Sequence, residues 1–173
     1  MKTKKLALCS MLSALGCALL LIGCVSDIFD LTFSCAASLI IVFAVIELKG
    51  PYPLLIYLVT GLVSLLILPV KFLAIIYLLF SGIYPVIKSK LEEKVKITWL
   101  LWLCKLVYFN AVLTIVILAA RYFLLLEQGE IVVLSLYGMG NATFVLFDIL
   151  LSKLITLYIR RFRAKLKIGR FLK

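Results

Sequence analysis

Ile97 to Leu126 reads ITWLLWLCKLVYFNAVLTIVILAARYFLLL, thirty consecutive residues in which Lys105 and Arg121 carry the only charges. A helix needs about 20 apolar residues to cross the roughly 30 Å hydrocarbon core of a bilayer. This stretch therefore predicts a membrane-spanning helix. It is longer than the bilayer requires, so we expect the helix to tilt or to project beyond the membrane.

Five further apolar windows accompany it along the chain. They run approximately from Leu6 to Cys24, Leu31 to Leu48, Tyr52 to Val70, Phe72 to Ile87 and Ile131 to Ile159. The six windows together cover about three quarters of the sequence, which leaves little for a soluble domain. Only Pro69 to Lys71 separates the third window from the fourth, so these two could instead form an interrupted hairpin or a re-entrant pair.

Composition places the whole chain in the membrane class. Of its 173 residues 65% are hydrophobic, whereas an ordinary soluble domain has about 45–50% apolar residues. Histidine is absent, and we find no phosphate-binding loop, no nucleophile elbow and no Cys-x-x-Cys pair. We therefore expect no enzymatic activity, no catalytic residues, no metal, no cofactor and no nucleic-acid partner for the chain alone.

The basic residues indicate how the chain crosses the membrane. The formal net charge is +11, and on a six-span path fifteen Lys and Arg fall on one side, against Lys71 and Arg121 on the other. The fifteen are Lys2, Lys4, Lys5, Lys49, Lys88, Lys90, Lys94, Lys96, Arg160, Arg161, Arg163, Lys165, Lys167, Arg170 and Lys173. Loops rich in Lys and Arg stay in the cytoplasm. The sequence thus predicts an all-α, polytopic protein of the plasma membrane, with six transmembrane helices and both termini cytoplasmic.

Two regions follow from this path: residues 1–160 form a six-helix membrane domain, and residues 161–173 form a basic cytoplasmic tail. An alternative concerns Cys24, because the segment Leu21-Ile22-Gly23-Cys24 follows a basic start and an apolar run, as in a bacterial lipoprotein signal peptide. A lipoprotein would continue into a polar domain, whereas this chain becomes apolar again at Leu31. We interpret the first window as a retained helix.

A stripe of small residues runs along the first window. Ser10, Ala14 and Ala18 recur every four residues and so share one face of a helix. In lipid, small residues allow two helix backbones to approach closely. The stripe is therefore either a packing face within the chain or a docking face for another membrane subunit.

The start of the chain resembles a known family of transporter subunits. The lysine-rich beginning runs into LALCSMLSAL from Leu6 to Leu15, and this start, the six spans and the short length are similar to the S components of energy-coupling-factor (ECF) vitamin transporters. In that family an Ala-x-x-x-Ala pattern on the first helix contacts the transmembrane T component, and separate ATPase subunits supply the energy. The pattern would fall on Ser10 and Ala14, or on Ala14 and Ala18. The resemblance implies a subunit that captures a vitamin-like small molecule.

Two charged residues fall inside the last two windows at similar depth. An ionisable group in the bilayer interior costs roughly 2.5–3.5 kcal/mol on insertion scales, so Lys105 and Asp148 need partners. Because the two windows are joined by a short loop, an ion pair between these residues is one interpretation. The other is a polar site for a ligand or a proton.

The sixth window also contains the sequence Tyr137-Gly138-Met139-Gly140-Asn141, in which two glycines expose the helix backbone. The resemblance implies a ligand held toward the outer side, near the later helices. The candidate substrate-binding residues are Asn110, Arg121, Tyr137, Gly138, Gly140 and Asn141. The alternative is that the glycines are close-packing residues and Tyr137 is an interface aromatic.

Two other classes of function compete with substrate capture. A non-transport scaffold or assembly protein would use its polar residues for packing and partner contacts. A small stand-alone secondary carrier would use Lys105 and Asp148 as coupling groups.

Overall fold

The computed structural model describes residues 2–26, 29–48, 50–124 and 130–162, and their regular secondary structure is entirely helical. The all-α fold class predicted from the sequence is therefore confirmed. The elements are α1 (Lys2–Ser26), α2 (Asp30–Glu47), α3 (Tyr52–Ile67), α4 (Lys71–Ile76), the π-helical turn η1 (Tyr77–Ser81), α5 (Tyr84–Lys94), α6 (Thr98–Leu124), α7 (Glu130–Leu157) and a second π-helical turn, η2 (Tyr158–Phe162). In order along the chain they correspond to the six apolar windows.

Five helical stretches are long and apolar enough to cross a membrane. They are Thr3–Ser26, Asp30–Glu47, Lys71–Lys94, Thr98–Ala119 and Ile131–Arg161. The sixth, α3, has 16 residues and a length of about 24 Å at 1.5 Å per residue, which is less than the roughly 30 Å hydrocarbon core. These helices suit a multi-pass membrane protein, and the six-span path itself stays a prediction.

The fourth stretch differs from its predicted bounds. It continues past the expected end at Ile87 to Lys94, through several charged residues. Lys, Glu and Leu are all good helix formers, so charge by itself does not stop a helix. Pro85 is the second residue of α5, and proline is tolerated in the first turn of a helix because the missing N–H has no intrahelical partner there.

The chain divides into two compact units. The first contains the residues up to Leu91 together with those from Ile159 onward, and the second contains Glu92–Tyr158. The single membrane domain over residues 1–160 stays a prediction, as does the basic tail, whose residues 163–173 lie outside the described part of the chain.

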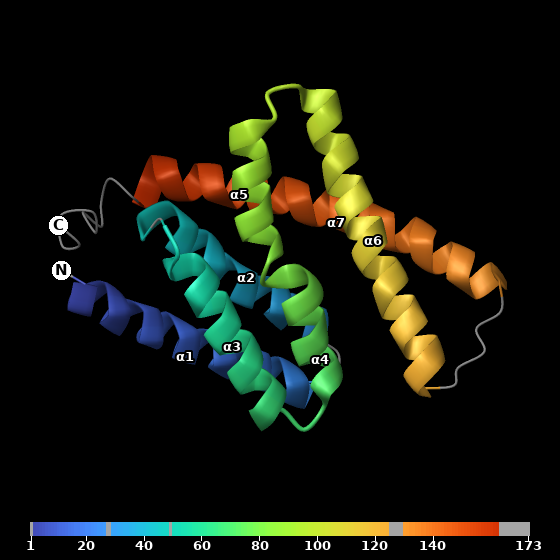
Figure 1. Ribbon diagram of the computed structural model, residues 1–173, viewed down its shortest axis with the longest axis horizontal. Helices are drawn as coiled ribbons and strands as arrows, with labels where there is room; N and C mark the ends of the chain where they lie inside the picture. Colours follow the sequence, from blue (N-terminus) through green and yellow to red (C-terminus); the bar gives the residue numbers. More distant parts are fainter. Residues whose placement is uncertain (1, 27–28, 49, 125–129, 163–173) are drawn as a thin grey trace. The chain divides into compact units, whose positions relative to one another are not determined.

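In the first unit α1 packs along both α2 and α3 (Figure 1). Leu20, Ile41 and Ile56 are fully buried in its core. Close approach of α1 to α3 depends on a glycine, because a Cβ atom added at Gly16 would lie only 2.9 Å from Cγ2 of Thr60. This is the small-residue packing that helices in lipid use.

The π-helical turn η1 is held by neighbouring helices. The amide of Gly82 bonds to the carbonyl of Tyr77 at 2.8 Å, which is the wide i to i+5 spacing of a π-helix. The Tyr57 hydroxyl on α3 donates to the Leu78 carbonyl at 2.7 Å. The Ser81 hydroxyl lies 2.6 Å from that of Ser34 on α2. The Leu78 carbonyl and the Ser81 hydroxyl of η1 are thus paired within the unit.

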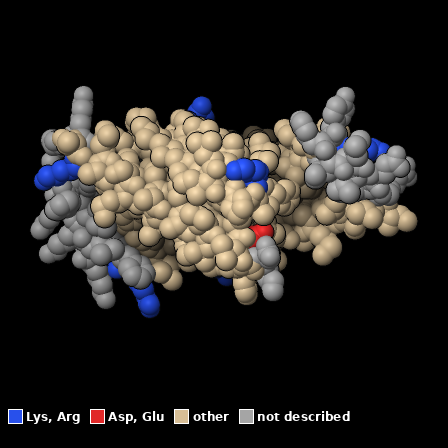
Figure 2. Space-filling model, turned by 90° about the horizontal axis from the view of Figure 1, so that it is seen from below, with Lys and Arg blue, Asp and Glu red and all other residues tan. Residues whose placement is uncertain are grey.

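Large apolar side chains cover much of the surface. Met11, Leu66 and Met139 are 70%, 79% and 73% exposed. Uncharged residues make up most of the face shown in Figure 2. A soluble monomer rarely exposes apolar patches of this extent, whereas lipid tails solvate them.

The orientation in the membrane gives a direct test. Both termini are expected in the cytoplasm, because the predicted path places fifteen basic residues on that side and two on the other. Reporter fusions after Lys173 and within residues 90–96 should both report a cytoplasmic location. A periplasmic or extracellular signal from either fusion would contradict the six-span path.

Candidate functional site

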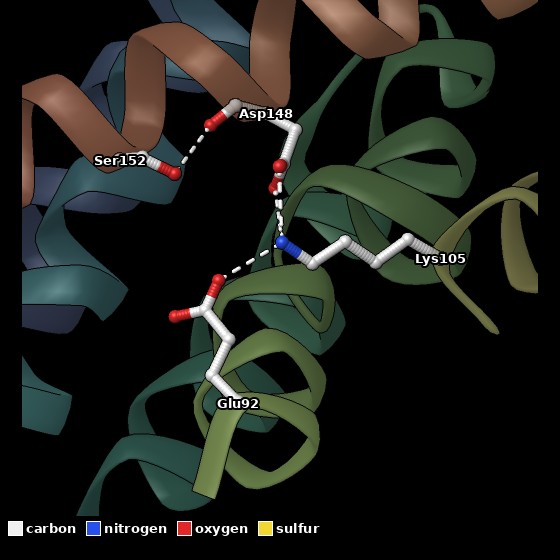
Figure 3. A network of polar contacts seen from close by, with 4 residues as sticks. All are labelled: Glu92, Lys105, Asp148 and Ser152. Carbon is white, nitrogen blue, oxygen red and sulfur yellow. Dashed lines mark hydrogen bonds and ion pairs between the residues drawn. The ribbon is translucent and has the colours of Figure 1, made fainter. Parts of the chain in front are cut away.

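A buried ammonium group lies at the centre of the second unit. Lys105 extends from α6, and its side chain is 3% exposed. Its Nζ lies 3.0 Å from Oδ2 and 3.3 Å from Oδ1 of Asp148 on α7, whose side chain is equally buried (Figure 3). The structure thus brings together the two charged residues that the sequence singled out at similar depth.

A third charged residue, Glu92, completes this ionic cluster and was missed from the sequence. Its Oε1 lies 2.9 Å from Nζ of Lys105, and its side chain is 42% exposed. Glu92 lies in the last helical turn of α5, which ends at Lys94. The chain reverses direction in the short connection to α6, and Glu92 therefore lies beside Lys105. Glu92 falls between the fourth and fifth apolar windows, where no pattern in the sequence indicates a contact.

Further contacts stabilise the cluster, which we define as Glu92, Lys105 and Asp148. The Lys105 ammonium lies 5.5 Å from the centre of the Trp102 ring, a distance at which the ring face attracts a cation. Ser152 donates to the backbone carbonyl of Asp148 at 2.9 Å (Figure 3). A buried charge is tolerated when it is paired and hydrogen-bonded, so the cluster can hold the last turn of α5 against α6 and α7.

Two asparagines pair reciprocally along the same helix interface. Nδ2 of Asn110 donates to Oδ1 of Asn141 at 3.0 Å, and Nδ2 of Asn141 donates to Oδ1 of Asn110 at 3.1 Å. Each amide also donates to a carbonyl of its own helix, that of Leu106 or of Tyr137, at 2.8 Å. Both N–H groups of each amide are therefore occupied within the protein.

The next polar pair joins the hydroxyls of Thr114 and Tyr137, whose oxygens are 2.7 Å apart. Together with Lys105–Asp148 and Asn110–Asn141, this pair forms a line of three polar contacts between α6 and α7, which we call the polar seam. Between the first two pairs, Phe109 and Phe144 stack with ring centres 4.6 Å apart. The seam sets the register of the two antiparallel helices.

The remaining candidate ligand residues differ in their surroundings. Gly140 faces α6, and a Cβ atom added there would lie 3.3 Å from Leu113 and 3.4 Å from Phe109. A Cβ atom added at Gly138 would meet nothing within 4 Å. Arg121 is exposed about three turns beyond Asn110 on α6. The structure thus brings Asn110, Tyr137, Gly140 and Asn141 to the α6–α7 interface but not Arg121 or Gly138.

On α1 the predicted stripe faces outward. Ser10, Ala14 and Ala18 are all exposed, and the Ser10 hydroxyl donates to the carbonyl of Ala7 in the same helix at 2.9 Å. The buried face of α1 carries other small residues, Ser13 and Gly16 among them. Small residues therefore occur on two faces of α1, and only the structure shows which face packs against α3.

Within the described residues, no group of three or more His, Cys, Asp or Glu side chains is placed to hold a metal ion. Comparison of the chain with protein-family models, with curated proteins and with solved structures finds no significant match. The features of this chain that bear on function are the exposed stripe of α1 and the polar seam.

Proposed function

We propose that this chain is the membrane-embedded substrate-capture subunit of a transporter of the ECF type. In this proposal it captures a vitamin-like small molecule at the plasma membrane, a T component binds the exposed stripe of α1, and ATPase subunits supply the energy. The observation that carries the proposal is the exposure of Ser10, Ala14 and Ala18. Because the opposite face of α1 already packs against α3, the stripe is available to a second protein.

Small residues suit such a contact for a physical reason. Lipid tails are as apolar as leucine, so helices in a membrane associate through close packing and interhelical hydrogen bonds rather than through the hydrophobic effect. A face of Ser and Ala brings a partner's backbone nearer than the bulky residues beside it, of which Met11 is 70% and Leu15 is 55% exposed.

Replacing Ala14 by leucine tests this docking face. We expect Ala14→Leu to fold normally, because the position is exposed, and to lose the T component and the ATPase subunits, because the added bulk separates the two backbones. The measurement is affinity purification of the tagged chain from its own cells, with the co-purified proteins identified by mass spectrometry.

The matched control is Ala111→Leu, the same change at an exposed alanine on α6. It should retain the partners. If the unaltered chain brings down no ATPase, or if Ala14→Leu retains its ATPase partner as well as Ala111→Leu does, the proposal is wrong. Partners without any ATPase would favour the scaffold class.

A second candidate function is a stand-alone carrier, favoured by one observation. The buried Lys105 ammonium contacts one buried and one half-exposed carboxylate, an arrangement that can couple protonation to a conformational change. Reconstitution of the pure chain into liposomes with an internal pH-sensitive dye tests it. Proton movement that depends on Lys105, in the absence of any other protein, would support the carrier over the capture subunit.

A further inference from the structure

Three hydroxyl-bearing side chains lie in the interior of the first unit, where α3 packs against α4 and η1 (Figure 1). Tyr77 and Ser64 are fully buried, and Thr60 is 1% exposed. Among the described residues, neither the Tyr77 hydroxyl nor the Ser64 Oγ has a hydrogen-bond partner within 3.5 Å. An unpaired buried hydroxyl costs free energy, so each such group calls for a partner.

The arrangement of the three residues suits a shared partner. Thr60 and Ser64 are one turn apart on α3 and therefore point to the same side, with Cβ atoms about 5–6 Å apart. The Tyr77 hydroxyl faces the Thr60 side chain, although the two oxygens are not within hydrogen-bonding distance of each other. The Thr60 hydroxyl donates to the Ser13 carbonyl across 3.5 Å and keeps its lone pairs free to accept.

The surroundings restrict what can bind there. A Cβ atom added at Gly82 would lie 2.8 Å from the rings of both Tyr57 and Tyr77, and one added at Gly16 would lie 2.9 Å from Thr60. The backbones at Gly16 and Gly82 are therefore closely packed and leave no room for a large partner beside them. The side chains of Tyr57, Thr60, Ser64 and Tyr77 are also uncharged, so the partner is neutral.

We propose that Thr60, Ser64 and Tyr77 together bind one buried water molecule inside the first unit. Buried waters typically make about three hydrogen bonds to polar groups that lack a protein partner. Nearby hydroxyls already have partners, since Tyr57 donates to the Leu78 carbonyl and Ser34 pairs with Ser81. Ser64 and Tyr77 are thus distinguished from these other hydroxyls of the unit, and Thr60 keeps the capacity to accept a bond beside the weak one that it donates to Ser13.

Solid-state NMR of the full chain in lipid bilayers tests for the water directly. With tyrosine labelled by ¹³C at Cζ, magnetisation transferred from water should reach Tyr77 and not Tyr57, whose hydroxyl is bonded to a carbonyl. Tyr77→Phe identifies the signal by removing it, and Ser64→Ala should weaken it several-fold. Equal transfer to Tyr57 and Tyr77, or none to either, would overturn the proposal.

Thermal unfolding provides the second measurement. Tyr77→Phe and Ser64→Ala should each lower Tm by about 2–4 °C, and the double variant should lose less than the sum because the two hydroxyls share one water. Additive losses, or an unchanged or raised Tm for Tyr77→Phe, would contradict a shared water. A small organic molecule that co-purifies with the unaltered chain and not with Tyr77→Phe would replace water as the occupant.

Discussion

Asp148→Ala is expected to destabilise the protein by about 3–5 kcal/mol and to lower its folded yield sharply, because the change breaks a buried ion pair. Lys105 and Asp148 are each 2% exposed, and their charged atoms lie 3.0 Å apart. Without the carboxylate, the contacts that the described residues leave to the Lys105 ammonium are those with Glu92 and the Trp102 ring. Fluorescence-detected size exclusion and thermal unfolding in detergent measure the loss.

Two further variants distinguish the loss of the Lys105–Asp148 ion pair from non-specific destabilisation of the protein. Glu92→Ala removes the other carboxylate that contacts Lys105, but this side chain is 42% exposed, so we expect a loss of about 1 kcal/mol or less. Combining Lys105→Met with Asp148→Leu removes both buried charges and should recover most of the yield. If the double variant is no more stable than Asp148→Ala, the two charges do not compensate each other.

Gly16→Leu is expected to prevent normal folding of the first unit. Even a Cβ atom at this position would lie 2.9 Å from Thr60, and leucine adds three more carbon atoms to a contact without space for one. Overpacking of this kind costs about 1–3 kcal/mol and can cost more. The measurement is the fraction of monodisperse protein after extraction from the membrane, together with its Tm.

Ala14→Leu serves as the control for this result, because it places the same side chain two residues away on the exposed face of α1. Its yield and Tm should match those of the unaltered chain. Equal damage from the two substitutions would mean that the α1 faces are assigned wrongly, and it would also remove the basis for the proposed docking stripe.

The position of the helices along the chain was largely predictable, because in lipid each backbone polar group must be paired within its own helix. Runs of apolar residues long enough to span a bilayer therefore become helices whatever their neighbours. The residues at which each helix ends were less predictable. The stretch from Lys71 continues to Lys94, because residues with high helix propensity extend a helix after its apolar part has ended.

Part of the candidate site was also predictable from the sequence. Lys105 and Asp148 lie at similar depth on neighbouring helices. This is enough to suggest that they pair, because an unpaired charge in the bilayer interior is costly. Glu92 could not be found in this way. Its contact depends on how the short connection between α5 and α6 turns the chain, and no pattern of charge or hydropathy encodes that turn.

The sequence by itself determined that the chain is helical, that its helices are apolar enough for a membrane, and which two charges need each other. Only the tertiary structure decided how each helix is rotated about its axis. Small residues lie on two faces of α1, yet Gly16 packs against Thr60 while Ala14 is exposed. The physical reason is that a helix that is apolar on every side has no preferred buried face, so its rotation is set by the shapes of the helices packed against it.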